Sequence, residues 1–332
     1  EVLNILSQQN NSKLHLTGVC NSANQVINPD GIVSQNAKTQ LKNGKTKTSL
    51  TELLNSAENY RNKIFIDCTT SNSLINKYET IFSSGFSIVA ANKKANTQSM
   101  KFYSRLRNLS FHNNIQFRYE TNVGAGLPVI STINSLLNSG DKIHKIEGVL
   151  SGTLSYLFNN FDGKDSFSNL VKTAQKKGYT EPDPREDLDG KDVARKCLIL
   201  GREIGYDLEL SDIKVESLLP EKSEDCKTTT EFLTHLSNFD NLYLKKLNHA
   251  KHNDKKLCYI GKIESKKAEV SLKAIDNEHP FYHLQGSENI ISITTSRYLE
   301  QPLVIRGHGA GADVTAGGVM ADVMEIIGNS DD

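Results

Sequence analysis

The sequence predicts an α/β fold in two parts: a parallel sheet with helices, followed by an α+β region with a mainly antiparallel sheet. In the first part, apolar runs that end in hydroxyl or charged residues (63–71 and 86–94) alternate with helix-like segments. This alternation is typical of a parallel sheet, whose ligands bind beyond the carboxyl ends of its strands. In the second part, segments 258–264, 268–275 and 288–298 alternate apolar and polar residues, which favours a half-exposed antiparallel sheet.

The overall composition excludes several classes of protein. The 332 residues include 39 of each charge sign, so no basic excess indicates binding to nucleic acid or to an anionic membrane. No apolar run approaches the roughly twenty residues of a membrane span, and the first residues do not resemble a signal peptide. We therefore expect a cytoplasmic protein. The cysteines are scattered singly, which predicts reduced thiols in the core rather than metal ligands: Cys20, Cys68, Cys197, Cys226 and Cys258.

The N-terminal region predicts an incomplete dinucleotide-binding unit. Residues 1–11 have the pattern of the end of a helix, and residues 13–20 that of a buried strand. In such a unit a strand and a G-x-G-x-x-G turn normally precede the helix, and both are missing here, so we expect an upstream segment to supply them. The polar stretch that follows contains one helical candidate, at 48–57, and another helix is expected at 73–82.

A glycine-rich turn follows the strand expected near residue 115 and precedes a helix at 131–140. Gly124 and Gly126 allow the backbone of this turn to approach a ligand closely. The turn could hold a phosphate, although it lacks the dinucleotide fingerprint. Alternatively, its carbonyl groups together with Glu120 could bind a hard cation.

The second part begins with a strand and helix at 143–160 and a further helix at 166–178. Gly178 fits the position that follows a helix C-terminus. Residues 211–256 are helical and polar. The chain then ends with another strand, glycine-rich turn and helix from 303 onward, in which a helix start could accept an anion.

The stretch from 178 to 196, G-Y-T-E-P-D-P-R-E-D-L-D-G-K-D-V-A-R-K, concentrates charge before a helix. Prolines stiffen its first half, and Asp189 with Gly190 predicts the helix start. Asp192 and Lys196 are four residues apart and therefore share one face of that helix. Two interpretations stay open: a site that binds a small zwitterion and moves a proton, or a surface helix with an ion pair of little consequence.

Six motifs in order along the chain identify a family. They are I-D-C-T-T-S (66–71), A-N-K-K-A-N-T (91–97), E-T-N-V-G-A-G-L-P-V-I (120–130), G-V-L-S-G-T-L-S-Y-L-F (148–158), the stretch 178–196 and R-G-H-G-A-G-A-D-V-T-A-G-G-V (306–319). With these motifs the chain resembles homoserine dehydrogenase, and most closely the dehydrogenase half of the bifunctional aspartokinase–homoserine dehydrogenases. The acidic stretch is the most specific of the six.

The resemblance implies reversible, nicotinamide-dependent conversion of L-aspartate 4-semialdehyde to L-homoserine, in threonine and methionine biosynthesis. Lys196 would be the general acid/base, Asp192 would orient substrate and amine, and Glu181 would accept from the substrate's ammonium group. The remaining residues expected at the substrate are Asp187, Gly178 and Thr153. The other acidic residues of the stretch, Asp183, Glu186 and Asp189, are expected to be structural or solvated.

The resemblance also implies a cofactor and a cation. The residues expected at the cofactor are Thr69, Lys93 and Gly309. After Cys20, the sequence N-S-A-N contains neither the acidic residue that favours NAD nor the arginine that favours NADP, so the expectation of NADP depends on the resemblance. The residues expected around a monovalent cation, typically sodium, are Glu120 and the carbonyls of Val123, Ala125 and Leu127.

The expected organisation is a Rossmann-type nucleotide-binding domain and a catalytic and dimerisation domain. We place the first at 1–126 with 310–332, and the second at 127–309. A homodimer or higher homo-oligomer is expected, in the cytoplasm or in a plastid, with a small-molecule substrate. The competing hypothesis is a cofactor-poor regulatory or assembly domain of a bifunctional chain, motivated by the missing glycine loop.

Overall fold

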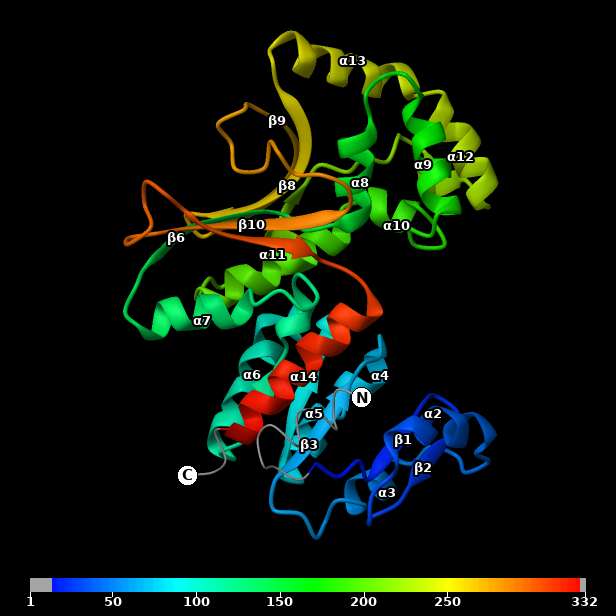
Figure 1. Ribbon diagram of the computed structural model, residues 1–332, viewed down its shortest axis with the longest axis vertical. Coiled ribbons are helices and arrows are strands. Elements are labelled where there is room, and N and C mark those ends of the chain that lie inside the picture. The colour runs from blue at the N-terminus through cyan, green and yellow to red at the C-terminus, as the bar shows by residue number, and fades with distance from the viewer. Residues whose placement is uncertain (1–13, 329–332) are drawn as a thin grey trace. The chain divides into compact units, whose positions relative to one another are not determined.

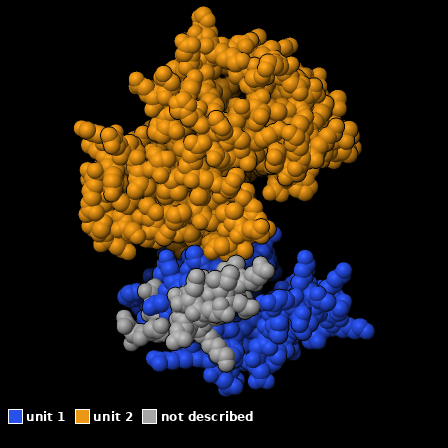
Figure 2. Space-filling view, viewed as in Figure 1, with its two compact units in different colours: residues 1–90, 104–118, 320–332 blue, residues 91–103, 119–319 orange. Residues whose placement is uncertain are grey.

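The computed structural model describes residues 14–328, and the chain divides into two compact units (Figures 1 and 2). Unit 1 comprises residues 1–90, 104–118 and 320–332, and unit 2 comprises 91–103 and 119–319. The fold is mixed α/β, as predicted, with a parallel sheet in unit 1 and a mostly antiparallel sheet in unit 2. The domain limits predicted above, 1–126 with 310–332 and 127–309, divide the chain by expected function and stay a prediction.

Unit 1 is built around a three-stranded parallel sheet. Its elements are β1 (Gly18–Cys20), β2 (Gln25–Ile27), α2 (Ser34–Asn43), α3 (Leu50–Asn55), β3 (Lys63–Asp67), α4 (Asn72–Ile75), α5 (Tyr78–Ser83), β4 (Phe86–Ala90), most of α6 (Met100–His112), β5 (Phe117–Arg118) and the end of α14 (Ala312–Gly328). The sheet has the order β3-β4-β5. Every residue of β4 is buried, and Tyr78 and Phe82 pack edge-on against Phe117 with ring centroids 5.8 Å apart.

The N-terminal part of unit 1 differs from the prediction. The buried strand expected at 13–20 is a short, partly exposed strand, β1, which pairs antiparallel with β2. The side chain of Asn21 accepts hydrogen bonds from the amides of Ala23 and Asn24, both at 2.8 Å, and this local turn directs the chain back onto itself. The helix predicted for residues 1–11 lies outside the described residues. The single helix expected at 73–82 is divided into α4 and α5.

Unit 2 is built around a six-stranded sheet of order β11-β10-β6-β8-β9-β7, in which β7 and β9 alone are parallel neighbours. Its elements are the 3-10 helices η1 (Lys93–Thr97), η2 (Glu120–Asn122), η3 (Leu210–Asp212) and η4 (Ser223–Asp225), the helices α7 (Ile130–Asn138), α8 (Gly152–Asn160), α9 (Phe167–Lys176), α10 (Arg185–Leu188), α11 (Lys191–Glu203), α12 (Thr229–Ser237) and α13 (Asp240–His252), and the strands β6 (Ile143–Val149), β7 (Lys214–Val215), β8 (Lys256–Glu264), β9 (Lys267–Ile275), β10 (Glu288–Thr295) and β11 (Leu303–His308).

The sheet of unit 2 is covered on both faces along its central strands. Helices α8, α11 and α13 pack against β8, and Leu257 and Tyr259 belong to the core that these helices share. Cys258 and Ile260 point to the opposite face because side chains alternate along a strand. There they join a second cluster with Phe281 from the loop after β9. The half-exposed sheet that we predicted is therefore wrong for β8 and β10, which are largely buried.

The cysteines differ in their surroundings. All five are free thiols, as predicted. Cys197 and Cys258 are buried, but Cys20 and Cys68 are exposed, so the expectation of core thiols is wrong for these two. Both exposed cysteines are at or next to a strand end, where the chain turns toward solvent. Within residues 14–328, no helix has the length and apolar character needed to cross a membrane.

Candidate active site

The start of helix α11 is a position that favours glycine. Gly190 has φ +72°, a conformation that L side chains rarely adopt. A Cβ atom at this position would also lie 2.1 Å from the hydroxyl oxygen of Tyr259. The carboxylate of Asp189, which precedes the N-cap residue Gly190, accepts a hydrogen bond from the amide of Lys191 at 2.8 Å and so satisfies one amide of the first turn. As a result, Asp192 lies in the first turn and Lys196 one turn later.

Three charged side chains meet at this end of α11. The Lys196 ammonium group lies 2.9 Å from one carboxylate oxygen of Asp192, and Lys93 of η1 lies 3.6 Å from the other. Lys196 also donates a 2.6 Å hydrogen bond to the carbonyl of Leu150, at the end of β6. Two of the three donors of the Lys196 ammonium group are thus engaged by residues that the structure describes. The side chain of Lys196 is 10% exposed, whereas that of Asp192 is 44% exposed.

The electrostatics of this cluster are coupled. Burial opposes ionisation of Asp192, but the positive charges of Lys196 and Lys93 outweigh it and lower the pKa of the carboxyl group. Burial lowers the pKa of Lys93; the charge of Asp192 acts in the opposite direction, and that of Lys196 adds to the lowering. The carboxylate of Asp192 therefore stays ionised between the amines of Lys93 and Lys196, and Lys93 loses its proton more readily than an ordinary lysine. Such an arrangement suits proton transfer near neutral pH.

A second group of carboxylates lies in the loop that precedes α11. Gly178, with φ +72°, ends α9, as predicted. The Thr153 hydroxyl then donates a 2.6 Å hydrogen bond to the carbonyl of Tyr179, and Asp187 accepts one of 2.8 Å from the amide of Glu181. Burial raises the pKa of Asp187, and the negative charges of Glu181 and Asp192 raise it further. This loop therefore holds negative charge in a fixed place that a cationic group would stabilise.

Asp192 of the first group and the carboxylates of the second line one cavity of about 370 Å³, whereas Lys93 and Lys196 are not among its lining residues. Its lining residues are Ser151, Glu181, Glu186, Asp187, Asp189, Lys191, Asp192, Val193 and Arg195. The volume suits an amino acid of a few carbon atoms. Asp183 is not among the lining residues; it forms a bidentate ion pair with Arg185, which agrees with the structural role expected for it.

The residues expected at the cofactor belong to separate parts of the chain. Thr69 is in unit 1, in the turn that follows β3, where its amide is bonded to Asp67 at 2.8 Å and its hydroxyl accepts from Ser71. Lys93 and Gly309 are in unit 2. At Gly309 a Cβ atom would lie 2.0 Å from the side-chain nitrogen of Asn289, so this turn requires glycine. Taken separately, the exposed hydroxyl of Thr69 beyond a parallel strand and the ammonium group of Lys93 are each of a kind that binds phosphate groups.

The turn expected to hold a cation is organised by Glu120. Its two carboxylate oxygens accept hydrogen bonds from the amides of Ile130 and Ser131, at 2.7 and 2.8 Å, at the start of α7. The carbonyl of Leu127 accepts from Val129 at 2.8 Å. Carbonyl and carboxylate oxygens are the ligand types that hard cations prefer. Among residues 14–328, no group of three or more His, Cys, Asp or Glu could hold a metal ion.

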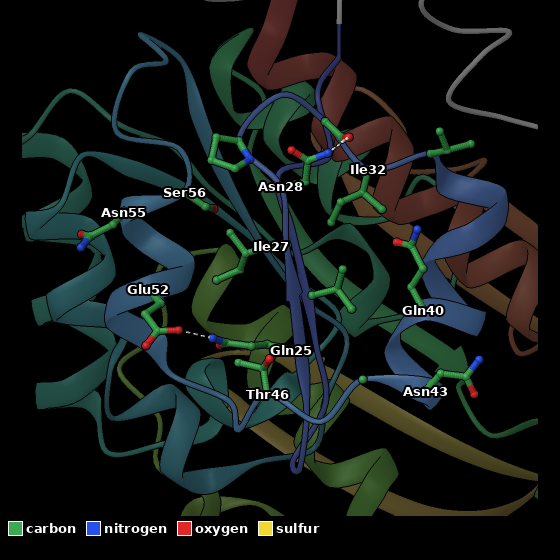
Figure 3. A pocket seen from close by; sticks show the side chains of 15 residues that line it. Gln25, Ile27, Asn28, Ile32, Gln40, Asn43, Thr46, Glu52, Asn55 and Ser56 are labelled. Carbon is green, nitrogen blue, oxygen red and sulfur yellow. Dashed lines mark hydrogen bonds between the residues drawn. The ribbon is translucent and has the colours of Figure 1, made fainter.

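A larger cavity, of about 960 Å³, lies within unit 1 (Figure 3). It is bordered by β2, α2 and α3, and the labelled side chains in Figure 3 are mostly amides and aliphatic groups. Gln25, which is 3% exposed, donates to Glu52 and accepts a 2.7 Å hydrogen bond from the amide of Ser49. These polar groups satisfy one another and stabilise the local fold.

The sequence located the acidic loop and the Asp192–Lys196 pair, but it did not indicate that the Leu150 carbonyl and Lys93 lie beside that pair. The Leu150 carbonyl leaves no signal in a sequence, because every residue has one. Lys93 was assigned to the cofactor, and its contact with Asp192 was not foreseen. The motif A-N-K-K directly after an apolar strand was the one available signal that a lysine lies at a strand end.

Two family models cover the chain. The model described as homoserine dehydrogenase, NAD binding domain, matches residues 1–120, and the model described as homoserine dehydrogenase matches residues 128–324. The bifunctional aspartokinase/homoserine dehydrogenase 1 of Zea mays is 43% identical over 327 residues, which are 97% of this chain and 36% of that protein. The chain thus spans about a third of the length of such relatives. The homoserine dehydrogenase of Schizosaccharomyces pombe is 43% identical over 272 residues, 80% of this chain and 72% of that protein.

Solved structures share the fold. A crystal structure of a Candida auris protein of unknown function superposes with a TM-score of 0.89 at 36% identity, covering 97% of this chain and 94% of that one. A hyperthermophilic archaeal homoserine dehydrogenase in complex with NADPH has a TM-score of 0.74 at 19% identity, covering 99% and 93%, and supports the fold alone. Through both family models and its relatives, the chain belongs to the homoserine dehydrogenase family.

Proposed function

We propose that this chain catalyses the reversible, NAD(P)-dependent interconversion of L-homoserine and L-aspartate 4-semialdehyde. The observation that carries the proposal is the cluster of Lys93, Asp192 and Lys196 beside an acidic cavity of about 370 Å³. A reaction that removes a hydride from carbon and a proton from the adjoining hydroxyl needs a basic group close to that hydroxyl. The family membership supports this choice among dehydrogenase reactions.

Lys196 is the proposed proton carrier. Its amine is held in one place by Leu150 and Asp192, at 2.6 and 2.9 Å. As homoserine is oxidised, the hydroxyl proton would pass to the neutral amine of Lys196, and Asp192 would stabilise the ammonium group that forms. In the reverse direction Lys196 would return the proton to the carbonyl oxygen of the semialdehyde. Asp192 orients the amine through both steps.

The acidic loop is the proposed site for the ammonium group of the substrate. Glu181 and Asp187 line the cavity and supply negative charge, and burial raises the pKa of Asp187. A substrate ammonium group would favour the ionised form of Asp187. Thr153 and Gly178 hold the loop in shape, the first through its hydrogen bond to Tyr179 and the second through its left-handed backbone.

Thr69, Lys93 and Gly309 are the proposed cofactor residues, with NADP preferred over NAD. When bound, the nicotinamide cofactor supplies the hydride acceptor or donor. Thr69 would contribute a hydroxyl and Lys93 a positive charge, and the Gly309 turn would allow the backbone to approach closely. Because Lys93 also contacts Asp192, it would join the cofactor residues to the groups that move the proton.

Three further assignments are part of the proposal. A monovalent cation, sodium in particular, would bind Glu120 and the carbonyls of Val123, Ala125 and Leu127. The cation assignment predicts a rate that depends on sodium or potassium, and Glu120→Gln should weaken that dependence without changing the affinity for NADP.

The chain would form a homodimer or higher homo-oligomer, which light scattering would measure. It would act in the cytoplasm or in a plastid.

The decisive experiment is an absorbance assay at the nicotinamide band with homoserine and either NADP or NAD, using the longest natural form of the protein that contains this chain. We expect homoserine-dependent reduction of the cofactor, faster with NADP. If neither cofactor is reduced by a folded protein, the proposed activity is wrong, and the alternative of a regulatory or assembly domain gains support.

A further inference from the structure

Arg202, near the end of α11, is a buried cation whose every donor is used. Its side chain is 0% exposed. The guanidinium group donates to the carbonyls of Asn96 and Gln98 at 2.9 and 2.8 Å, and twice to the carbonyl of Leu208 at 3.0 and 2.8 Å. A fifth bond, of 3.1 Å, reaches the carboxylate of Glu209. Five donors in a planar fork match five hydrogen bonds, a set that the compact ammonium group of lysine could not make.

Two of these bonds hold the segment that carries Lys93. Residues 93–98 lie along α11 and are fixed to it at two places: Lys93 contacts Asp192 in the first turn of the helix, and Asn96 and Gln98 are bound by Arg202 near its end. The two attachments differ in strength. Lys93 and Asp192 are 33% and 44% exposed, and ion pairs of this kind contribute little by themselves. The hydrogen bonds of Arg202 come from a charged and fully buried guanidinium group and are therefore the stronger attachment.

Other contacts extend the same attachment. The Asn96 side chain donates a 2.8 Å hydrogen bond to that of Asn122, and both residues are 0% exposed. The second carboxylate oxygen of Glu209 accepts a 2.7 Å bond from the amide of Met100. The guanidinium group of Arg202 also lies 5.0 Å from the ring centre of Tyr103. Together these contacts hold the segment from residue 96 to 103 against one end of α11.

We propose that Arg202 is a positioning residue of the active site, which holds segment 93–98 on helix α11 and thereby keeps the Lys93 amine beside Asp192. Helix α11 thus carries the proton-transfer groups Asp192 and Lys196 in its first turns. Near its end it carries Arg202, which brings a third charged group, Lys93, to them. The catalytic meaning of this placement rests on the proposed function. The placement of Lys93 itself does not, and it can be measured without turnover.

The test replaces Arg202 by lysine in the full chain and measures the position of Lys93 directly. Arg202→Lys keeps the charge but loses the fork. The readout is the acetylation of Lys93 as a function of pH, followed by mass spectrometry, with exposed Lys267 of β9 as the internal reference. In the native protein, burial, Lys196 and Arg195 make Lys93 less basic, and Asp192 opposes them. Because burial is the largest of these effects, a loosened segment should shift the Lys93 midpoint upward.

The matched control is Arg297→Lys, which alters an exposed arginine bound to the carbonyl of Ser139 and should leave the Lys93 midpoint unchanged. Glu209→Gln is a milder variant for the case in which Arg202→Lys does not fold, and a smaller shift in the same direction is expected. The proposal is overturned if folded Arg202→Lys leaves the Lys93 midpoint at the native value. Where Arg202→Lys does not fold, the same result in folded Glu209→Gln overturns it. A change in melting temperature does not alter either conclusion.

Turnover separates this proposal from the proposed function. Arg202→Lys should lower kcat for homoserine oxidation about tenfold, because small displacements of a positioned group are costly. In a Lys93→Ala background the same substitution should change kcat less than twofold, since the group that it positions is gone. Fully additive effects would contradict the positioning role. If the native protein is inactive but the Lys93 midpoint still shifts in Arg202→Lys, the proposed activity is refuted. The proposal that Arg202 positions Lys93 is then still supported.

Discussion

The two cavities of this protein differ in size and in chemistry, and the smaller one has the features of an active site. The cavity of unit 1 measures about 960 Å³, and its polar side chains, such as Gln25 and Glu52, are bonded to each other. The cavity of unit 2 measures about 370 Å³ and contains carboxylates whose pKa values shift in opposite directions: raised at Asp187, lowered at Asp192. Ionisable groups with perturbed pKa values, more than volume, indicate where chemistry takes place.

The difference has a structural origin. The charged groups of unit 2 are placed by a helix whose start and end are both fixed, at Gly190 and at Arg202. In unit 1 the cavity lies between short elements whose side chains stabilise turns, as when Asn28 bonds to the carbonyl of Gly31 at 2.7 Å. Four predictions test this contrast, from the largest expected effect on turnover to the smallest.

The largest effect is expected for Lys196→Ala. Loss of a positioned acid/base group should lower kcat by about a hundredfold or more, while binding of NADP stays near the native value. The measurement is steady-state kinetics in both directions. Lys267→Ala, an exposed lysine of the β8–β9 hairpin, is the control and should keep native turnover. Near-normal turnover in Lys196→Ala would move the proton-transfer role to another group.

A smaller loss, of about tenfold to a hundredfold, is expected for Asp192→Asn, because the ammonium form of Lys196 loses its counter-ion. Stability should change little. The lowered pKa of Asp192 means that its carboxylate stabilises the fold above the pKa of the unfolded chain and loses this effect as pH falls through the folded value. At 44% exposure that contribution is small. Glu264→Gln is the matched control for both kinetics and melting, because Glu264 also pairs with a lysine, Lys262, and its side chain is 45% exposed.

Asp187→Asn should separate binding from stability. The raised pKa of Asp187 means that its ionised form destabilises the fold above that pKa, a cost that disappears as pH falls below the unfolded value. The substitution should therefore raise the melting temperature slightly at neutral pH and have no such effect near pH 3. The KM for homoserine should increase about tenfold, because a charged hydrogen bond to the ammonium group is lost. A lower melting temperature at neutral pH would contradict this account.

The smallest effect on turnover is expected in the larger cavity. Gln25→Ala leaves the amide of Ser49 without its acceptor and should reduce the free energy of unfolding by about 1–3 kcal/mol. The kcat at a temperature where the protein is folded should change less than twofold. Denaturant unfolding and the absorbance assay measure the two quantities. A large fall in kcat, with stability unchanged, would show that this cavity takes part in the reaction.

Features set by neighbouring residues could be read from the sequence. The extended segments that become β3 and β4, the glycine that ends α9 and the spacing of Asp192 and Lys196 all depend on patterns within a few residues, so the sequence alone predicted them. The motifs also pointed to the family that the comparisons establish. Where the local pattern was ambiguous, prediction failed, as in the short hairpin at β1 and the buried strands β8 and β10.

Contacts between distant residues were decided by the tertiary structure. Lys196 meets the Leu150 carbonyl across 46 positions, and Arg202 binds the carbonyls of Asn96 and Gln98 across more than a hundred. No sequence periodicity encodes such pairs, because they depend on how strands and helices pack and on backbone groups that every residue has. The sequence by itself thus determined which helix carries the charged groups; packing decided that Lys93 joins them and that Arg202 holds it there.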